Sequence, residues 1–150
     1  MEFTKQDLNK TLWVKKDFLE KNRVRYKTDA TGKTLGRLAA EIANKLTGKN
    51  NVYYNDFWDA GDYVIVENAD KIIVTGNKLD DKNYYSYSGY KGNLKTITLR
   101  ALMKKKPLDP LVTAVRGMIP RNKLRDGRMK RLKVVLGSTA QYDNFKPISF

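Results

Sequence analysis

One amphipathic stretch, set between extended segments, most constrains the fold of this chain. Leucine and isoleucine recur at helical spacing at Leu35, Leu38, Ile42 and Leu46, which predicts a helix with a single apolar face. A short strand is expected at 26–29 before this helix, and the run YVIVEN at 63–68 is typical of a strand buried on both faces. A strand, a helix and a second strand in this order form a crossover connection, so the two strands are expected to be parallel.

Further elements follow from similar patterns. Two more apolar runs, KIIVTG at 71–76 and LKVVLG at 132–137, are expected to be strands, which makes about four in all. Thr34 and Asp109 are expected to cap helices, and Gly48 suits a left-handed helix end. Another helix is expected around 99–103. The chain is therefore predicted to be one α/β domain at 24–141, with an N-terminal arm at 1–23 and a C-terminal tail at 142–150. Leu8, Leu12 and Leu19 could share a helix face in the arm.

Composition narrows the possible functions. The 150 residues include neither cysteine nor histidine, which excludes disulfides, thiolate chemistry and histidine-based catalysis or metal binding. The net charge of +14 is typical of proteins that bind nucleic acid. No apolar run has the length of a signal peptide or a membrane helix, so a cytoplasmic location without membrane contact is expected.

The sequence Gly32-Lys33-Thr34 raises the question of a nucleotide site. A phosphate-binding loop of the Walker type would need glycine at position 27, which is lysine here. Lys33 and Arg37 nevertheless lie at the start of the expected helix, where backbone N–H groups favour anions such as a nucleic-acid phosphate. Ordinary turn chemistry with solvated cations explains the same residues equally well.

Three acids, Asp56, Asp59 and Asp62, precede the strand at 63–68. They could bind Mg²⁺ or act as an acid–base pair. No histidine, cysteine or nucleophile accompanies them, so we expect them to be turn residues that accept hydrogen bonds from backbone donors. No catalytic residue, metal or cofactor is predicted.

The densest charge lies in the stretch 116–133. It contains eight basic residues and one acid, so half of the net charge of +14 lies there. Glycine and proline interrupt it, which predicts a shaped loop suited to folded RNA rather than a long recognition helix. Arginine forks bind phosphate oxygens in pairs. The candidate RNA-binding residues are Arg116, Arg121, Lys123, Arg125, Arg128, Lys130, Arg131 and Lys133.

The tyrosine-rich stretch 84–90 is followed by Lys91. Aromatic rings beside cations can stack on unpaired bases, which makes Tyr85 and Lys91 further RNA-binding candidates. Half-buried packing in an extended segment explains alternate tyrosines about as well.

Four blocks of this sequence resemble the ribosomal protein L13 family in its bacterial form. They are DATGKTLGRLA (29–39), GDYVIVENADKIIVTGNK (61–78), YYSYSGYKG (84–92) and AVRGMIPRNKLRDGRMKRLKVVLG (114–137). The last block is the most specific. The chain departs from the family at Arg25, where the family has tryptophan, and where family histidines are replaced by Phe57, Ser86, Tyr87 and Tyr90.

The resemblance implies a three-layer α/β/α domain with a mixed, largely parallel sheet. It implies a structural, non-catalytic constituent of the large ribosomal subunit that binds large-subunit ribosomal RNA, supports assembly and contacts neighbouring ribosomal proteins, with no small-molecule substrate. Two alternatives stay open: a phosphate- or nucleotide-handling enzyme using Lys33, and a DNA-binding regulator. By match to the family's blocks, the RNA-facing candidates are Lys33, Arg37, Lys78, Arg116, Arg121, Arg128 and Lys133.

Overall fold

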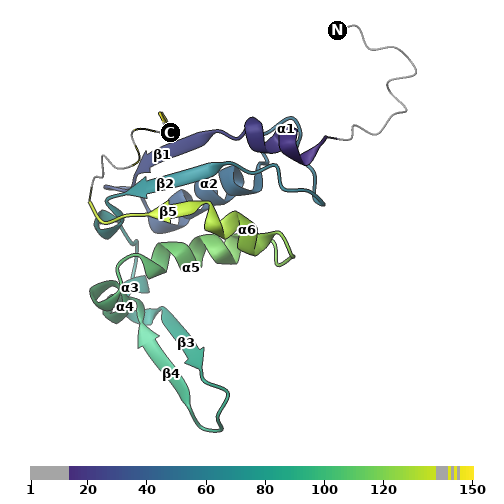
Figure 1. The fold of residues 1–150 in the computed structure, drawn as a ribbon. Coiled ribbons are helices and arrows are strands. Elements are labelled where there is room, and N and C mark those ends of the chain that lie inside the picture. Colours follow the sequence, from purple (N-terminus) through teal and green to yellow (C-terminus); the bar gives the residue numbers. More distant parts are fainter. Residues whose placement is uncertain (1–13, 138–141, 143, 145) are drawn as a thin grey trace, which may run out of the picture.

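A four-stranded parallel sheet forms the centre of the protein. The computed structural model describes residues 14–137, 142, 144 and 146–150. The strand order is β5-β2-β1-β6, and every pair of neighbours is parallel (Figure 1). The fold class expected from the sequence is therefore confirmed. The strands are β1 (Arg25–Asp29), β2 (Tyr63–Glu67), β5 (Leu132–Val134) and β6 (Ile148–Ser149).

Antiparallel pairing occurs in a separate hairpin, which extends away from the sheet (Figure 1). Its strands are β3 (Asn83–Tyr87) and β4 (Leu94–Thr98). The tyrosine-rich stretch thus forms one strand of a two-stranded ribbon and the loop that follows it.

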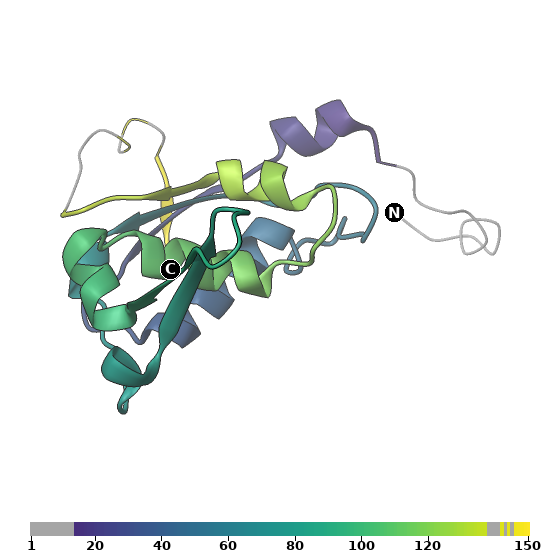
Figure 2. The same ribbon diagram turned by 90° about the horizontal axis from the view of Figure 1, so that it is seen from below.

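The helices flank the sheet and connect its strands. Residues of α2 and α5 join Val64 and Val66 of β2 in one buried core, so these two helices cover the same face (Figure 2). Each leucine, isoleucine or valine side chain buried there contributes about 1.5–3 kcal/mol relative to exposure. The helices are α1 (Lys16–Lys21), α2 (Leu35–Thr47), α3 (Lys78–Asp81), α4 (Leu99–Lys105), α5 (Asp109–Met118) and α6 (Arg125–Lys130), with a 3₁₀ turn η2 (Ala69–Lys71).

The crossover unit forms as the sequence predicts. Helix α2 connects the parallel strands β1 and β2, and it ends at Gly48 with a left-handed φ of 79°. Two expected caps differ. Thr34 precedes α2 but its side chain makes no capping hydrogen bond, and α5 begins at Asp109 itself rather than after it.

The expected strand at 71–76 is wrong. Its backbone bonds to the turn before α2 instead of to a strand: Ile73 N–H donates to Lys33 O at 3.0 Å, and Leu35 N–H donates to Ile73 O at 3.1 Å. Only the Thr34–Ile73 bridge forms, because η2 and the positive φ of Gly76 bend the chain on either side. The fourth strand is β6, from the segment that the sequence predicts to be a tail.

The arm contains α1, in which Leu19 is buried. The proposed helix face of Leu8 and Leu12 lies outside the described residues, as does the predicted domain boundary at 141. The division into arm, domain and tail stays a prediction.

Candidate nucleic-acid interface

The basic stretch 116–133, here called the basic loop, runs from the C-terminal end of α5 through α6 to β5. Ile119 is 1% exposed and anchors the loop in the core between its charged residues. Arg125 is half-buried. Arg116 approaches Asp126 at 4.0 Å, but both side chains are exposed and such pairs contribute little. Five cations of the loop are exposed: Arg116, Arg121, Lys123, Lys130 and Lys133.

The two remaining arginines of the basic loop point inward, onto Asp59. Arg131 is 6% exposed and forms a bidentate pair with this carboxylate, with an Nη2–Oδ1 distance of 2.6 Å. Its guanidinium also donates to the carbonyl oxygens of Leu46 and Asp62, both at 3.3 Å. Arg128 is 2% exposed, and its Nε lies 3.5 Å from Asp59 Oδ1. Arg23 Nη2 approaches the same carboxylate at 3.6 Å.

Electrostatics keep Asp59 ionised within this cluster. Burial by itself would raise the pKa of Asp59. The hydrogen bonds and charge of Arg131, with the charges of Arg23 and Arg128, outweigh burial and hold that pKa below its ordinary value. The ionised carboxylate therefore ties α6 and β5 to the segment that precedes β2.

These contacts refine two expectations from the sequence. Arg128 and Arg131 are engaged within the protein. Their guanidinium groups bind Asp59 and so attach the basic loop to the segment before β2. Of the three acids, Asp62 does accept a backbone hydrogen bond, from Val24 N–H at 2.9 Å, and burial raises its pKa. Asp59 instead binds guanidinium groups, and Asp56 accepts a hydrogen bond from the Tyr54 hydroxyl at 2.7 Å.

Lys33 of the Gly-Lys-Thr sequence is also engaged internally. Its Nζ donates to Thr28 Oγ1 at 2.7 Å and to the carbonyl oxygen of Phe150 at 3.3 Å. The turn between β1 and α2 is tight, and Gly32 adopts a φ of 72° within it. This geometry holds the lysine against the C-terminal strand instead of presenting it to the phosphates of a nucleotide.

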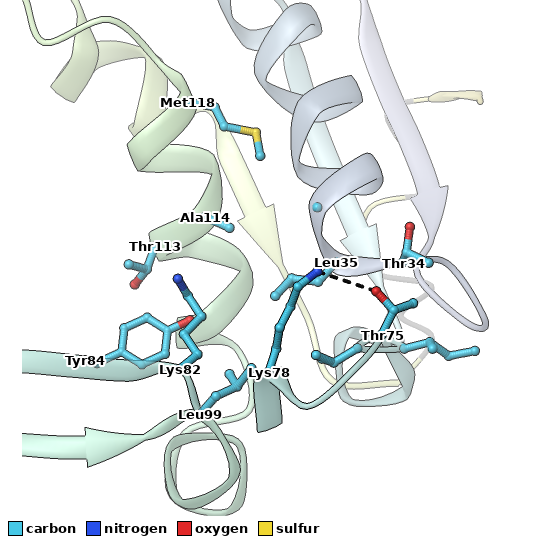
Figure 3. A pocket seen from close by; sticks show the side chains of 13 residues that line it. Thr34, Leu35, Thr75, Lys78, Lys82, Tyr84, Leu99, Thr113, Ala114 and Met118 are labelled. Carbon is cyan, nitrogen blue, oxygen red and sulfur yellow. Dashed lines mark hydrogen bonds between the residues drawn. The ribbon is translucent and has the colours of Figure 1, made fainter. Parts of the chain in front are cut away.

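Lys78 and Arg37 are exposed, and Lys78 lines a cavity beside the start of α2 (Figure 3). Lys82 enters the same cavity and was not among the residues predicted from the sequence. The four-residue spacing between Lys78 and Lys82 is the signal that could have identified it, because residues so spaced share a helix face.

The hairpin presents the other two candidates. Tyr85 is 67% exposed, and Lys91 is exposed in the connecting loop. Tyr87 and Leu94 are directly paired across the strands and are each 60% exposed, so this face is open toward the tip of the hairpin. The hairpin therefore lies apart from the basic loop, which follows the far end of α5 (Figure 1).

Among the described residues, no group of three or more acidic side chains is arranged to hold a metal ion. None of the helices in the described part of the chain is long and apolar enough to cross a membrane.

Together, the fold and the surface define a basic α/β domain in which five exposed cations are carried on a loop that buried arginines hold in place. The family described as Ribosomal protein L13 matches residues 23–141. The chain is 49% identical over 122 residues to the large ribosomal subunit protein uL13 of Pelobacter propionicus, covering 81% of this chain and 86% of that protein. It is 50% identical over 119 residues to the protein of the same name from Thermoanaerobacter sp., covering 79% and 83%.

A third relative, the large ribosomal subunit protein uL13 of Desulfotalea psychrophila, is 47% identical over 113 residues, covering 75% of this chain and 80% of that protein. The chain therefore belongs to the ribosomal protein L13 family. Members of this family are structural proteins of translation and not enzymes.

Proposed function

We propose that this protein binds large-subunit ribosomal RNA through the exposed cations of the basic loop and thereby supports assembly of the large subunit in the cytoplasm. Its partners are this RNA and neighbouring large-subunit proteins. Family membership and the names of the relatives support this role. The loop supplies the chemistry, since arginine and lysine neutralise phosphates without reading base sequence.

The observation that carries the proposal is that the basic loop contains two kinds of cation, buried ones that bind Asp59 and exposed ones that are open to a partner. Arg128 and Arg131 are buried on Asp59, whereas five other cations of the same stretch are exposed. The buried contacts limit the motion of the loop, so the exposed cations lose less conformational entropy when RNA binds. Arg37, Lys78, Tyr85 and Lys91 are exposed on other elements and complete the proposed surface.

The test is a triple variant, Arg116→Ala, Arg121→Ala and Lys123→Ala, titrated against large-subunit ribosomal RNA by filter binding at several salt concentrations. These side chains are exposed, so the variant is expected to fold like the wild type. Each phosphate contact adds about 0.7–0.9 to the slope of log affinity against log salt, so the slope should fall by about 2 when three contacts are lost.

A matched control removes the same charge at the opposite end of α5. Lys104, Lys105 and Lys106 are exposed, and α4 meets the N-terminal end of α5 (Figure 1). Their replacement by alanine should leave the salt slope near that of the wild type. Equal slopes for the two triple variants would show that net charge alone governs binding, and the basic loop would not be the contact surface.

A further inference from the structure

A cavity of about 350 Å³ opens beside the basic loop, between the start of α2, the short helix α3 and α5 (Figure 3). This volume lies at the small end of ligand pockets, which span about 300–1,000 Å³. Met118, the last residue of α5, lines the cavity, and Arg116 of the basic loop lies two residues before it. The cavity and the basic loop are thus neighbours on one helix.

The lining of the cavity is mainly apolar. Leu99 is fully buried at its base, and Leu35 and Ala114 are half-buried in its walls. The ring of Tyr84 forms another wall, and burial raises the pKa of its hydroxyl, which therefore stays neutral. A flat, weakly polar group such as a nucleobase suits this lining, since every base presents a face that packs on aromatic and apolar side chains.

Two ammonium groups lie over this apolar lining. Lys78 and Lys82 extend their side chains toward the space between α2 and α5 (Figure 3). Lys78 Nζ lies 3.5 Å from Thr75 Oγ1, and Lys82 Nζ lies 5.6 Å from the centre of the Tyr84 ring.

Neither ammonium group is neutralised within the part of the chain that the structure describes. No described carboxylate lies within 4.0 Å of Lys78 Nζ or Lys82 Nζ, although α3 also carries Asp80 and Asp81. Asp80 instead accepts hydrogen bonds from Nε and Nη2 of Arg100, at 2.7 and 2.8 Å. Two unneutralised cations beside an apolar hollow are complementary to a phosphate attached to a base.

We infer that this cavity holds one unstacked nucleotide of the bound RNA, with the base against Leu35, Ala114 and Met118 and the phosphate at Lys78 and Lys82. The inference rests on the proposed function and adds a specific subsite to it. Met118 belongs both to the cavity lining and to the basic loop, so one RNA strand can contact the two sites. A strand of RNA is favoured over a free nucleotide because no loop among the described lining residues encloses the phosphate.

The test fills the cavity without disturbing the fold. A Cβ atom at Gly36, which lines the cavity, would meet no atom within 4 Å, so Gly36→Leu adds bulk at an open position. Leucine is also a better helix residue than glycine, so α2 should not be weakened. Ala40→Leu, at an exposed position on the same helix, is the matched control, and thermal unfolding of both variants verifies folding.

Affinity for large-subunit ribosomal RNA, measured by filter binding, should fall about tenfold for Gly36→Leu, as expected from the loss of one stacked base. Affinity should fall similarly for the double variant Lys78→Ala and Lys82→Ala. Both lysines are exposed, so this variant should fold, and it tests the subsite even if Gly36→Leu does not fold. Ala40→Leu should bind like the wild type. If the filling variant and the double lysine variant both retain wild-type affinity, the subsite is refuted while the proposed function stands.

A second measurement separates the remaining outcomes. A single-stranded RNA hexanucleotide should shift the NMR methyl signals of Met118 and Ala114 in the wild type and not in Gly36→Leu. If the wild type shows no salt-dependent binding to ribosomal RNA, the proposed function is refuted. If the hexanucleotide also leaves the methyl signals of the wild type unshifted, the subsite is refuted as well. Shifts caused equally by adenosine monophosphate, with ribosomal RNA binding unchanged in Gly36→Leu, would identify a free-nucleotide site and overturn the inference.

Discussion

Arg131 donates hydrogen bonds to the carboxylate of Asp59 from both terminal nitrogens of its guanidinium group, although the two residues lie 72 positions apart in the sequence. The same guanidinium reaches the carbonyl oxygen of Leu46 at the end of α2. One arginine therefore joins three segments: the start of β5, the end of α2 and the segment before β2. The exposed cations of the basic loop depend on this join for their position.

The two inward arginines are expected to contribute differently to stability. Arg131 makes a bidentate ion pair and two bonds to carbonyl oxygens, whereas Nε of Arg128 is buried and finds no hydrogen-bond partner in the described structure. Removing one partner of a buried pair strands the other charge, so Arg131→Met should lower the free energy of unfolding by about 3 kcal/mol. Arg128→Met should change it by less than about 1 kcal/mol, because the buried Nε of Arg128 makes no hydrogen bond and Arg131 and Arg23 still neutralise Asp59.

Urea unfolding followed by circular dichroism measures both changes. The comparison fails if the two variants lose the same stability, since Asp59 would then be held equally by both arginines. Arg128→Met, if stable, also permits a binding measurement, and its RNA affinity should stay close to that of the wild type because Arg128 is 2% exposed and Arg131 still ties the loop to Asp59.

Acid should destabilise the protein partly through Asp29. Backbone and side-chain hydrogen bonds from Thr31, with one from Asn68, lower the pKa of Asp29 from 3.8 to about 2. A carboxyl whose pKa is lowered by folding stabilises the protein above its unfolded pKa, and that contribution is lost as pH falls through the folded value. Wild-type stability should therefore decrease between about pH 4 and about pH 2, and Asp29→Ala should show a shallower decrease.

Thermal unfolding across this pH range measures the effect of Asp29. Asp59 acts in the same direction because its pKa is also lowered, so the variant keeps part of the slope. Asp62 acts in the opposite direction, since burial raises its pKa. Parallel curves for wild type and Asp29→Ala would show that the hydrogen bonds at Asp29 do not survive in solution.

Gly61 is required by close packing beneath the Asp59 cluster. A Cβ atom there would lie 1.8 Å from the carbonyl oxygen of Leu46 and 2.9 Å from Nη2 of Arg131. Gly61→Ala must therefore displace the backbone and is expected to cost about 3 kcal/mol or more in denaturant unfolding. Gly127→Ala is the control: its Cβ meets nothing within 4 Å in α6, so stability should stay the same or rise by up to about 1 kcal/mol. Similar losses in both variants would rule out the packing argument.

The hairpin should be the most dynamic strand pair in the free protein. Both β3 and β4 are largely exposed, and a two-stranded ribbon is marginally stable by itself. Its backbone amides should exchange hydrogen faster than those of β1 and β2, as measured by mass spectrometry. If Tyr85 and Lys91 contact RNA as proposed, ribosomal RNA will slow hairpin exchange and leave β1 and β2 unchanged. Unaltered hairpin exchange in the complex would exclude it from the interface.

The sequence predicted the crossover unit because its signals are local. The apolar stripe of α2, the left-handed end at Gly48 and the β-branched run of β2 each lie within a single element. Strand β6 escaped prediction because two residues carry no periodicity, and its pairing is determined by β1, more than a hundred residues away. The run at 71–76 has strand-like composition, yet its backbone is bonded by the β1–α2 turn.

The candidate interface was also predicted only in part from the sequence. A cluster of cations is visible in the sequence, but the direction of each side chain depends on acids that are distant in the chain. Arg128 and Arg131 look no different in sequence from Arg121, and only the position of Asp59 turns them inward. Lys82 was missed because its role arises from a cavity that four helices, distant from one another in the sequence, form together.

The pairing of β6 with β1 has a consequence for biosynthesis. Strand β1 is synthesised well before its partner β6 and is paired on one side by residues 148 and 149, so that edge stays open until those residues have been translated. Long-range parallel pairing of this kind slows folding and leaves an unprotected strand edge in the nascent chain. Closure of the sheet is thus a late event, and Lys33 can reach its bond with Phe150 only after it.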